Sequence, residues 1–166
     1  DDVRLTKAVG EINKAHVIML MEQKISQWQD GAKILRALLK QSDIKLHPSA
    51  EDVHMAVEEA VLNETGSEVG GNLHIAKSRN DQVATAIRIE LRKDLLNLIS
   101  RVARLRESLT RLAEKYIETI IPGYTHLQPA QPITFAHVLL AYSDMLGRSV
   151  DRLEETYHRT NQSPMG

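Results

Sequence analysis

The spacing of apolar residues along this chain is that of a helical protein. Apolar positions recur at helical intervals within residues 2–25, 26–40 and 49–66, and again through two longer stretches at 81–116 and 135–160. Prolines occur only at positions 48, 122, 129, 132 and 164, so almost all of these stretches are free to be helical. We therefore predict a mainly α fold.

Short polar residues stand where these helices should begin. The expected N-terminal caps are, in chain order, Ser26, the pair Ser49 and Asp52, the pair Ser78 and Asp81, and Thr134. Three of the five prolines fall within 121–132, so this stretch is expected to be an extended loop between the last two helices.

The helix predicted over 81–116 carries an apolar seam with alternating spacings of three and four residues. Its members are Leu95, Leu98, Val102, Leu105, Leu109, Leu112 and Tyr116. At 1.5 Å per residue, such a helix is about 54 Å long. A single helix cannot bury its own seam, so the seam predicts packing against neighbouring helices.

Composition narrows the possible functions. The 166 residues include 21 Lys and Arg against 22 Asp and Glu, which provides no field for attracting nucleic acid or an anionic membrane. The chain has no cysteine, which excludes disulfides and thiolate metal sites. No apolar run approaches the roughly 20 residues of a membrane helix, and the first residues do not resemble a signal peptide. The simplest expectation is a soluble cytoplasmic protein.

Residues 70–82 form the first segment that suggests chemistry. A glycine-containing loop in this segment delivers Ser78, Arg79 and Asn80 to the start of the long helix. The free N–H groups and the positive end of the helix dipole at such a place attract a carboxylate. The alternative is that Ser78 only caps the helix and Arg79 is solvated, and from the residues alone this alternative is favoured.

Residues 123–132 form the second such segment. They place Thr125, His126 and Gln128 among prolines, which restrict the backbone that presents these side chains. Histidine is well suited to proton transfer near neutral pH. A structural histidine between helices fits the segment equally well.

The remaining histidines suggest less chemistry. His54 and Glu58 are four residues apart on a predicted helix, and an exposed helix contact is the favoured interpretation of this pair. None of the seven histidines forms an HxxxH or similar close pair, so we expect no metal site.

In this order, the motifs resemble the amino-terminal portion of the argininosuccinate lyase family, within the fumarase and aspartase superfamily. The matching segments are Glu-Asp-Val-His-Met-Ala-Val-Glu at 51–58, Gly-Gly-Asn-Leu-His-Ile-Ala-Lys-Ser-Arg-Asn-Asp-Gln-Val-Ala-Thr at 70–85, Gly-Tyr-Thr-His-Leu-Gln-Pro-Ala-Gln-Pro at 123–132 and Asn-Gln-Ser-Pro-Met-Gly at 161–166. Residues 1–50 match the family only in helical pattern.

This resemblance implies a fold and a reaction. It implies a small amino-terminal helical domain over 1–77, followed over 78–166 by the first long helices of a central bundle in a homotetramer. The implied reaction, part of arginine biosynthesis, is the reversible, cofactor-free β-elimination of argininosuccinate to arginine and fumarate. A base removes a proton beside a carboxylate, bound donors stabilise the resulting charge, and an acid assists the leaving nitrogen.

The resemblance also implies residue roles. His126 corresponds to the catalytic histidine, while Thr125 and Asn80 correspond to substrate-binding residues. Ser78, Arg79 and Gln128 are expected beside them in the substrate site. Under this resemblance both segments are functional, and the helix start and the substrate site are the same place.

This chain departs from the family pattern in two respects that bear on the implied activity. Ile75-Ala76-Lys77 replaces the usual Thr-Gly-Arg, and Lys lacks the planar fork with which Arg grips a carboxylate. The family's loop with the catalytic serine is missing, so the chain is expected to be a partial subunit that is inactive alone. Adenylosuccinate lyase, fumarase and aspartase are the nearest rivals, and a non-catalytic helical protein such as a lens crystallin is the rival from another class.

Overall fold

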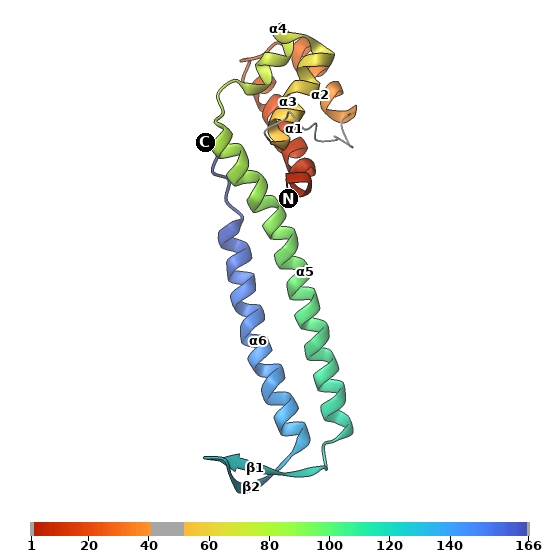
Figure 1. Cartoon of the computed structure of the whole chain (residues 1–166), viewed down its shortest axis with the longest axis vertical. Helices are drawn as coiled ribbons and strands as arrows, with labels where there is room; N and C mark the ends of the chain where they lie inside the picture. The colour runs from red at the N-terminus through yellow and green to blue at the C-terminus, as the bar shows by residue number, and fades with distance from the viewer. Residues whose placement is uncertain (1, 41–51, 166) are drawn as a thin grey trace. The chain divides into compact units, whose positions relative to one another are not determined.

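The computed structural model describes residues 2–40 and 52–165, which are mainly helical, as the apolar pattern predicts (Figure 1). Its elements are the 3-10 helix η1 (Asp2–Leu5), α1 (Thr6–Glu22), α2 (Trp28–Lys40), α3 (Val53–Thr65), α4 (Ser67–Gly70), the 3-10 helix η2 (Gly71–His74), α5 (Arg79–Lys115), β1 (Ile120–Thr125), β2 (Gln128–Thr134) and α6 (Phe135–Thr160). None of the helices described is both long enough and apolar enough to cross a membrane.

The first helix ends earlier than the predicted residue 25. The N–H of Ile25 donates to the carbonyl of Leu20 at 2.9 Å, and the N–H of Lys24 donates to that of Met21 at 3.0 Å. Lys24 has a φ of 59°, in the left-handed region. This pair of bonds around a left-handed residue is a common way to end a helix, usually with glycine in the place that Lys24 occupies in this chain.

Two of the predicted caps need correction. The helix predicted from Ser26 begins instead at Trp28, and the Ser26 hydroxyl is buried without a hydrogen-bond partner among the described residues. Ser49 lies outside the described residues. Asp52 itself caps α3, because its carboxylate accepts a hydrogen bond from the N–H of Met55 at 2.6 Å.

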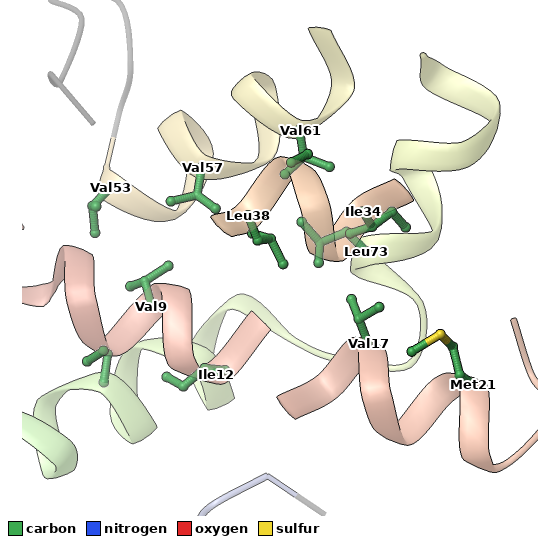
Figure 2. Close-up of a cluster of buried hydrophobic side chains, with 13 residues drawn as sticks. Val9, Ile12, Val17, Met21, Ile34, Leu38, Val53, Val57, Val61 and Leu73 are labelled. Carbon is green, nitrogen blue, oxygen red and sulfur yellow. The ribbon is translucent and has the colours of Figure 1, made fainter. Parts of the chain in front are cut away.

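The first compact unit, comprising the chain up to Leu91 and the segment from Gln162, has one apolar core between α1, α2, α3 and η2 (Figure 2). On α1, five apolar residues at helical spacing are all buried: Val9, Ile12, Val17, Leu20 and Met21. On α2, Ile34 is buried whereas Leu39 is 66% exposed, although both are apolar residues of the same helix. Five residues of helix rotate Leu39 by about 140° away from Ile34, which explains the difference.

α5 runs without a break through 37 residues, close to the predicted 81–116. Its residues up to Leu91 belong to the first compact unit, and those from Arg92 belong to the second, which comprises Arg92–Asn161. The domain boundary at 77/78 stays a prediction, since the two compact units share α5.

In the second unit, α5 and α6 lie side by side and antiparallel (Figure 1). Near the hairpin, Ala113, Ala136 and Leu139 form a small buried apolar cluster. Much of the predicted seam on α5 remains uncovered: Leu95 is 7% exposed, but Leu98 and Leu105 are 46% and 50% exposed. One neighbouring helix therefore buries only part of the seam.

The stretch predicted as an extended loop is extended, but it forms a hairpin in which β1 pairs antiparallel with β2. Pro122 lies opposite Pro132, and an irregularity in register follows at Gly123. A side chain at Gly123 would come within 3.0 Å of the Gln131 carbonyl oxygen. Proline tolerates this setting because each strand of a two-stranded ribbon has one unpaired edge.

Candidate functional site

The start of α5 is a reciprocal capping arrangement. The Ser78 hydroxyl accepts a hydrogen bond from the N–H of Asn80 at 3.2 Å, and the N–H of Ser78 donates to the Asp81 carboxylate at 3.3 Å. The capping role predicted for Ser78 and Asp81 is thus confirmed. Ser78 and Asn80 are both exposed, so a helix N-terminus and two polar side chains are presented to solvent.

Arg79, the first residue of α5, is directed toward two carboxylates of its own chain. Its Nη2 donates to Glu58 Oε2 at 3.0 Å, and its Nη1 lies 3.6 Å from Asp52 Oδ1. The other oxygen of Glu58 lies 3.1 Å from Nδ1 of His74. Glu58 therefore joins α3 to both η2 and α5. A substrate-binding role for Arg79 stays a prediction, and its two carboxylate contacts indicate that it anchors the start of α5.

The exposed pair predicted between His54 and Glu58 is wrong. His54 is 2% exposed, and neither ring nitrogen has a hydrogen-bond partner of good geometry among the described residues. Burial lowers the pKa of His54, while the nearby Asp52 carboxylate acts in the opposite direction. Glu58 pairs with Arg79 and His74 instead, because His54 turns into the core beside Gln82, itself 1% exposed.

Two polar residues of α1, His16 and Asn13, hold the loop that precedes α5. The sequence pattern did not single out either residue. His16 Nε2 lies 2.8 Å from the carbonyl oxygen of Ile75, and Lys77 Nζ donates a hydrogen bond to Asn13 Oδ1. Burial lowers the pKa of Lys77 to about 8, with Glu58 opposing and Arg79 reinforcing the shift. The signal was available, because Asn13 and His16 lie four and seven residues after Val9, on the buried stripe of α1.

The second predicted segment places its polar residues at the tip of the hairpin. Thr125 pairs with Gln128, and the two residues between them, His126 and Leu127, have φ angles of 51° and 64°. A two-residue turn with both central residues left-handed matches the twist of a hairpin, although it usually contains Asn and Gly. All four residues are exposed, and Leu127 is 93% exposed. The turn therefore presents His126 to solvent at the end of the hairpin.

The predicted site residues thus fall into two groups. Ser78, Arg79 and Asn80 belong to the first compact unit, and Thr125, His126 and Gln128 belong to the second. Each group combines polar side chains at one place on a defined backbone. Their roles in substrate binding and catalysis stay predictions.

The chain matches the model of the lyase family over residues 3–166. The argininosuccinate lyase of Methanosarcina mazei is 46% identical over 158 residues, covering 93% of this chain and 32% of its own length. That of Haloarcula marismortui is 45% identical over 168 residues, covering 100% of this chain and 34% of its own. The crystal structure of an EDDS lyase in complex with formate superimposes with a TM-score of 0.91 at 34% identity, covering 99% of this chain and 33% of that chain.

The chain is mainly helical, and it belongs to the lyase family. The resemblance to argininosuccinate lyases predicted from the sequence is confirmed by the curated relatives. The chain spans about a third of the length of those relatives.

Proposed function

We propose that these residues form part of an argininosuccinate lyase, which reversibly cleaves argininosuccinate to arginine and fumarate without a cofactor. The observation that carries this proposal is the 45–46% identity to curated argininosuccinate lyases, over alignments that take in at least 93% of the chain. The expected setting is arginine biosynthesis in the cytoplasm.

The two groups of site residues suit different parts of the reaction. The exposed Ser78 and Asn80 at the start of α5 would hold a substrate carboxylate, helped by the helix dipole. At the hairpin tip, Thr125 and Gln128 would contact substrate beside His126, which would take part in proton transfer. Donors around the carboxylate would stabilise the negative charge that develops when the neighbouring carbon loses its proton.

We further propose that the working enzyme is a homotetramer and that the 166-residue chain alone is inactive. The uncovered seam supports assembly, because α5 and α6 leave a groove of about 520 Å³ lined by apolar residues such as Leu105, Leu109 and Met145. The share of the relatives that the chain spans supports inactivity, since about two thirds of their length has no counterpart in these residues. Sedimentation of the chain should show self-association, and a well-folded monomer at tens of micromolar would count against it.

A chimeric enzyme provides the test of the activity. The 166 residues would replace the matching third of the Methanosarcina mazei argininosuccinate lyase, and fumarate release would be followed by ultraviolet absorbance. We expect turnover of argininosuccinate, and none of adenylosuccinate or EDDS. An oligomeric, folded chimera without turnover of argininosuccinate would contradict the proposal and favour a non-catalytic role. The isolated chain should release no fumarate above a heat-treated control.

A further inference from the structure

The loop from Ile75 to Ser78 is held on both sides of one strained residue. Ala76 has a φ of 58°, in the left-handed region, which is strained for a residue that carries a side chain. On one side, the Ile75 carbonyl contacts the His16 ring, and on the other side, the Lys77 ammonium contacts Asn13. Both contacts come from α1, about 60 residues earlier in the chain.

The contact between Lys77 and Asn13 is unusual because it is buried. Lys77 is 8% exposed, and Asn13 is 1% exposed. Burying an ammonium group costs free energy, and an apolar side chain of similar size would fill the same space without that cost. The contact must therefore be explained by something other than core filling. A direct contact of Lys77 with substrate does not explain it, because the ammonium group points to Asn13 inside the unit.

The position of Lys77 in the chain supplies the explanation. The next residue, Ser78, caps α5, and Asn80 lies in its first turn. A shift of Lys77 must therefore move the cap and the exposed side chains beside it. Arg79 is held in the same way from α3, through Glu58 and Asp52. The start of α5 is thus tied to two other helices by charged contacts.

We propose that Lys77 and Asn13 are positioning residues, whose buried contact fixes where the start of α5 presents Ser78 and Asn80 to a substrate carboxylate. This inference rests on the proposed function, because that function supplies the carboxylate. Lys77 acts through the backbone of the residues that follow it and does not touch the substrate itself.

The test measures the loop and the carboxylate site separately in the 166-residue chain. Amide hydrogen exchange of residues 75–81 reports the loop, and the shifts of the Ser78–Asp81 amide resonances during titration with fumarate report binding. The variants are Lys77→Met, Asn13→Leu, the double variant and Lys77→Arg. The matched control is Lys7→Met, which makes the same change at an exposed position of α1.

We expect faster exchange confined to 75–81 in Lys77→Met and in Asn13→Leu. Each should raise the dissociation constant of fumarate about tenfold, a size consistent with a lost hydrogen bond to a charged group. The double variant should be no weaker than either single one, because both remove the same contact. Lys77→Arg restores a buried cation and should bring both readings back, whereas Lys7→Met should change neither.

Three results would contradict the positioning role of Lys77. Unchanged exchange or unchanged fumarate affinity in a folded Lys77→Met would overturn the positioning role, as would failure of Lys77→Arg to rescue. If Lys77→Met unfolds the whole unit, the milder Lys77→Gln, compared with Lys77→Arg, gives the same reading. If the exchange changes as expected but the unaltered chain shows no fumarate shift at Ser78–Asp81, inhibition of the chimeric enzyme by fumarate replaces the titration. Absence of inhibition there contradicts the carboxylate site of the proposed function, whereas the exchange result upholds the positioning of the loop.

Discussion

Arg92 on α5 contacts Tyr157 on α6 in two ways. Its Nη2 donates a hydrogen bond to the phenol oxygen at 2.8 Å, and its guanidinium carbon lies 5.0 Å from the centroid of the same ring. These contacts join the two helices of the second unit at the end away from the hairpin.

Tyr157→Phe removes the hydrogen bond and keeps the ring beneath the guanidinium. We expect the free energy of unfolding to fall by about 1 kcal/mol. Tyr157→Leu removes the ring as well and should cost about 0.5–1 kcal/mol more. Urea denaturation measures both values, with Tyr142→Phe, an exposed tyrosine on the same helix, as the control. Equal stability of Tyr157→Phe and the unaltered chain would show that the hydrogen bond contributes nothing.

Glu58→Gln tests the carboxylate that joins α3 to α5 and η2. The amide keeps the size of the side chain but weakens its contacts with Arg79 and His74, so unfolding should become easier by about 1–3 kcal/mol. The matched change Glu107→Gln breaks an exposed pair with Arg111 on α5 and should have little effect, as surface pairs usually do. Thermal melts of both variants provide the comparison, and similar losses in the two would count against a special role for Glu58.

Acid should destabilise the first unit through its buried histidines. Burial lowers the pKa of both His16 and His54 below the ordinary 6.5, although the Ile75 carbonyl opposes this at His16 and Asp52 opposes it at His54. As pH falls below 6.5, the unfolded chain binds these protons before the folded chain does, so stability is lost between 6.5 and the lowered pKa. Urea midpoints should therefore decrease as the pH is lowered from neutral through this range. His54→Leu should make that decrease smaller, and an unchanged slope in His54→Leu would remove His54 from this explanation.

Lys77 should change the free energy of unfolding at alkaline pH. Its pKa is about 8 in the folded chain against the ordinary 10.5, so between these values the unfolded chain binds the proton more often. Stability should therefore increase as pH rises above about 8, by up to about 1.4 kcal/mol per pH unit from this group. Comparing the urea midpoints of the unaltered chain and Lys77→Met on either side of this pKa isolates the contribution. A difference between the two proteins that does not vary with pH would contradict it.

His126→Gln in the chimeric enzyme tests the role at the hairpin tip. If His126 transfers a proton, turnover should fall roughly 10²–10⁴-fold. The melting temperature should not change, because the side chain is exposed. His137→Gln, an exposed histidine at the start of α6, is the matched control. Loss of activity that follows loss of folding would assign His126 a structural role instead.

Features set by neighbouring residues could mostly be predicted from the sequence, with the cap at Ser26 as an exception, whereas contacts between distant residues could not. The caps at Ser78 and Thr134 depend on residues within three positions, and both are confirmed. The hairpin was predicted only as an extended stretch, because its prolines argue against a sheet unless the strands are known to stand alone. The buried stripe of α1 indicated that Asn13 is buried, but its contact with Lys77, like that of Glu58 with Arg79, depends on residues far apart in the chain.

Ala76 shows how contacts with distant residues change which residue types a position tolerates. The family pattern usually has glycine at this position, the residue best suited to a left-handed backbone. Alanine there is strained in the folded chain but restricts the unfolded chain, and the second effect returns about 0.4–1 kcal/mol. Since His16 and Lys77 hold the residues on either side, the conformation follows from those contacts and not from the identity of residue 76. At a left-handed position the strain of alanine exceeds this gain, so the contacts of His16 and Lys77 keep the turn at a net cost. A motif that demands glycine would overlook a chain that keeps the same turn.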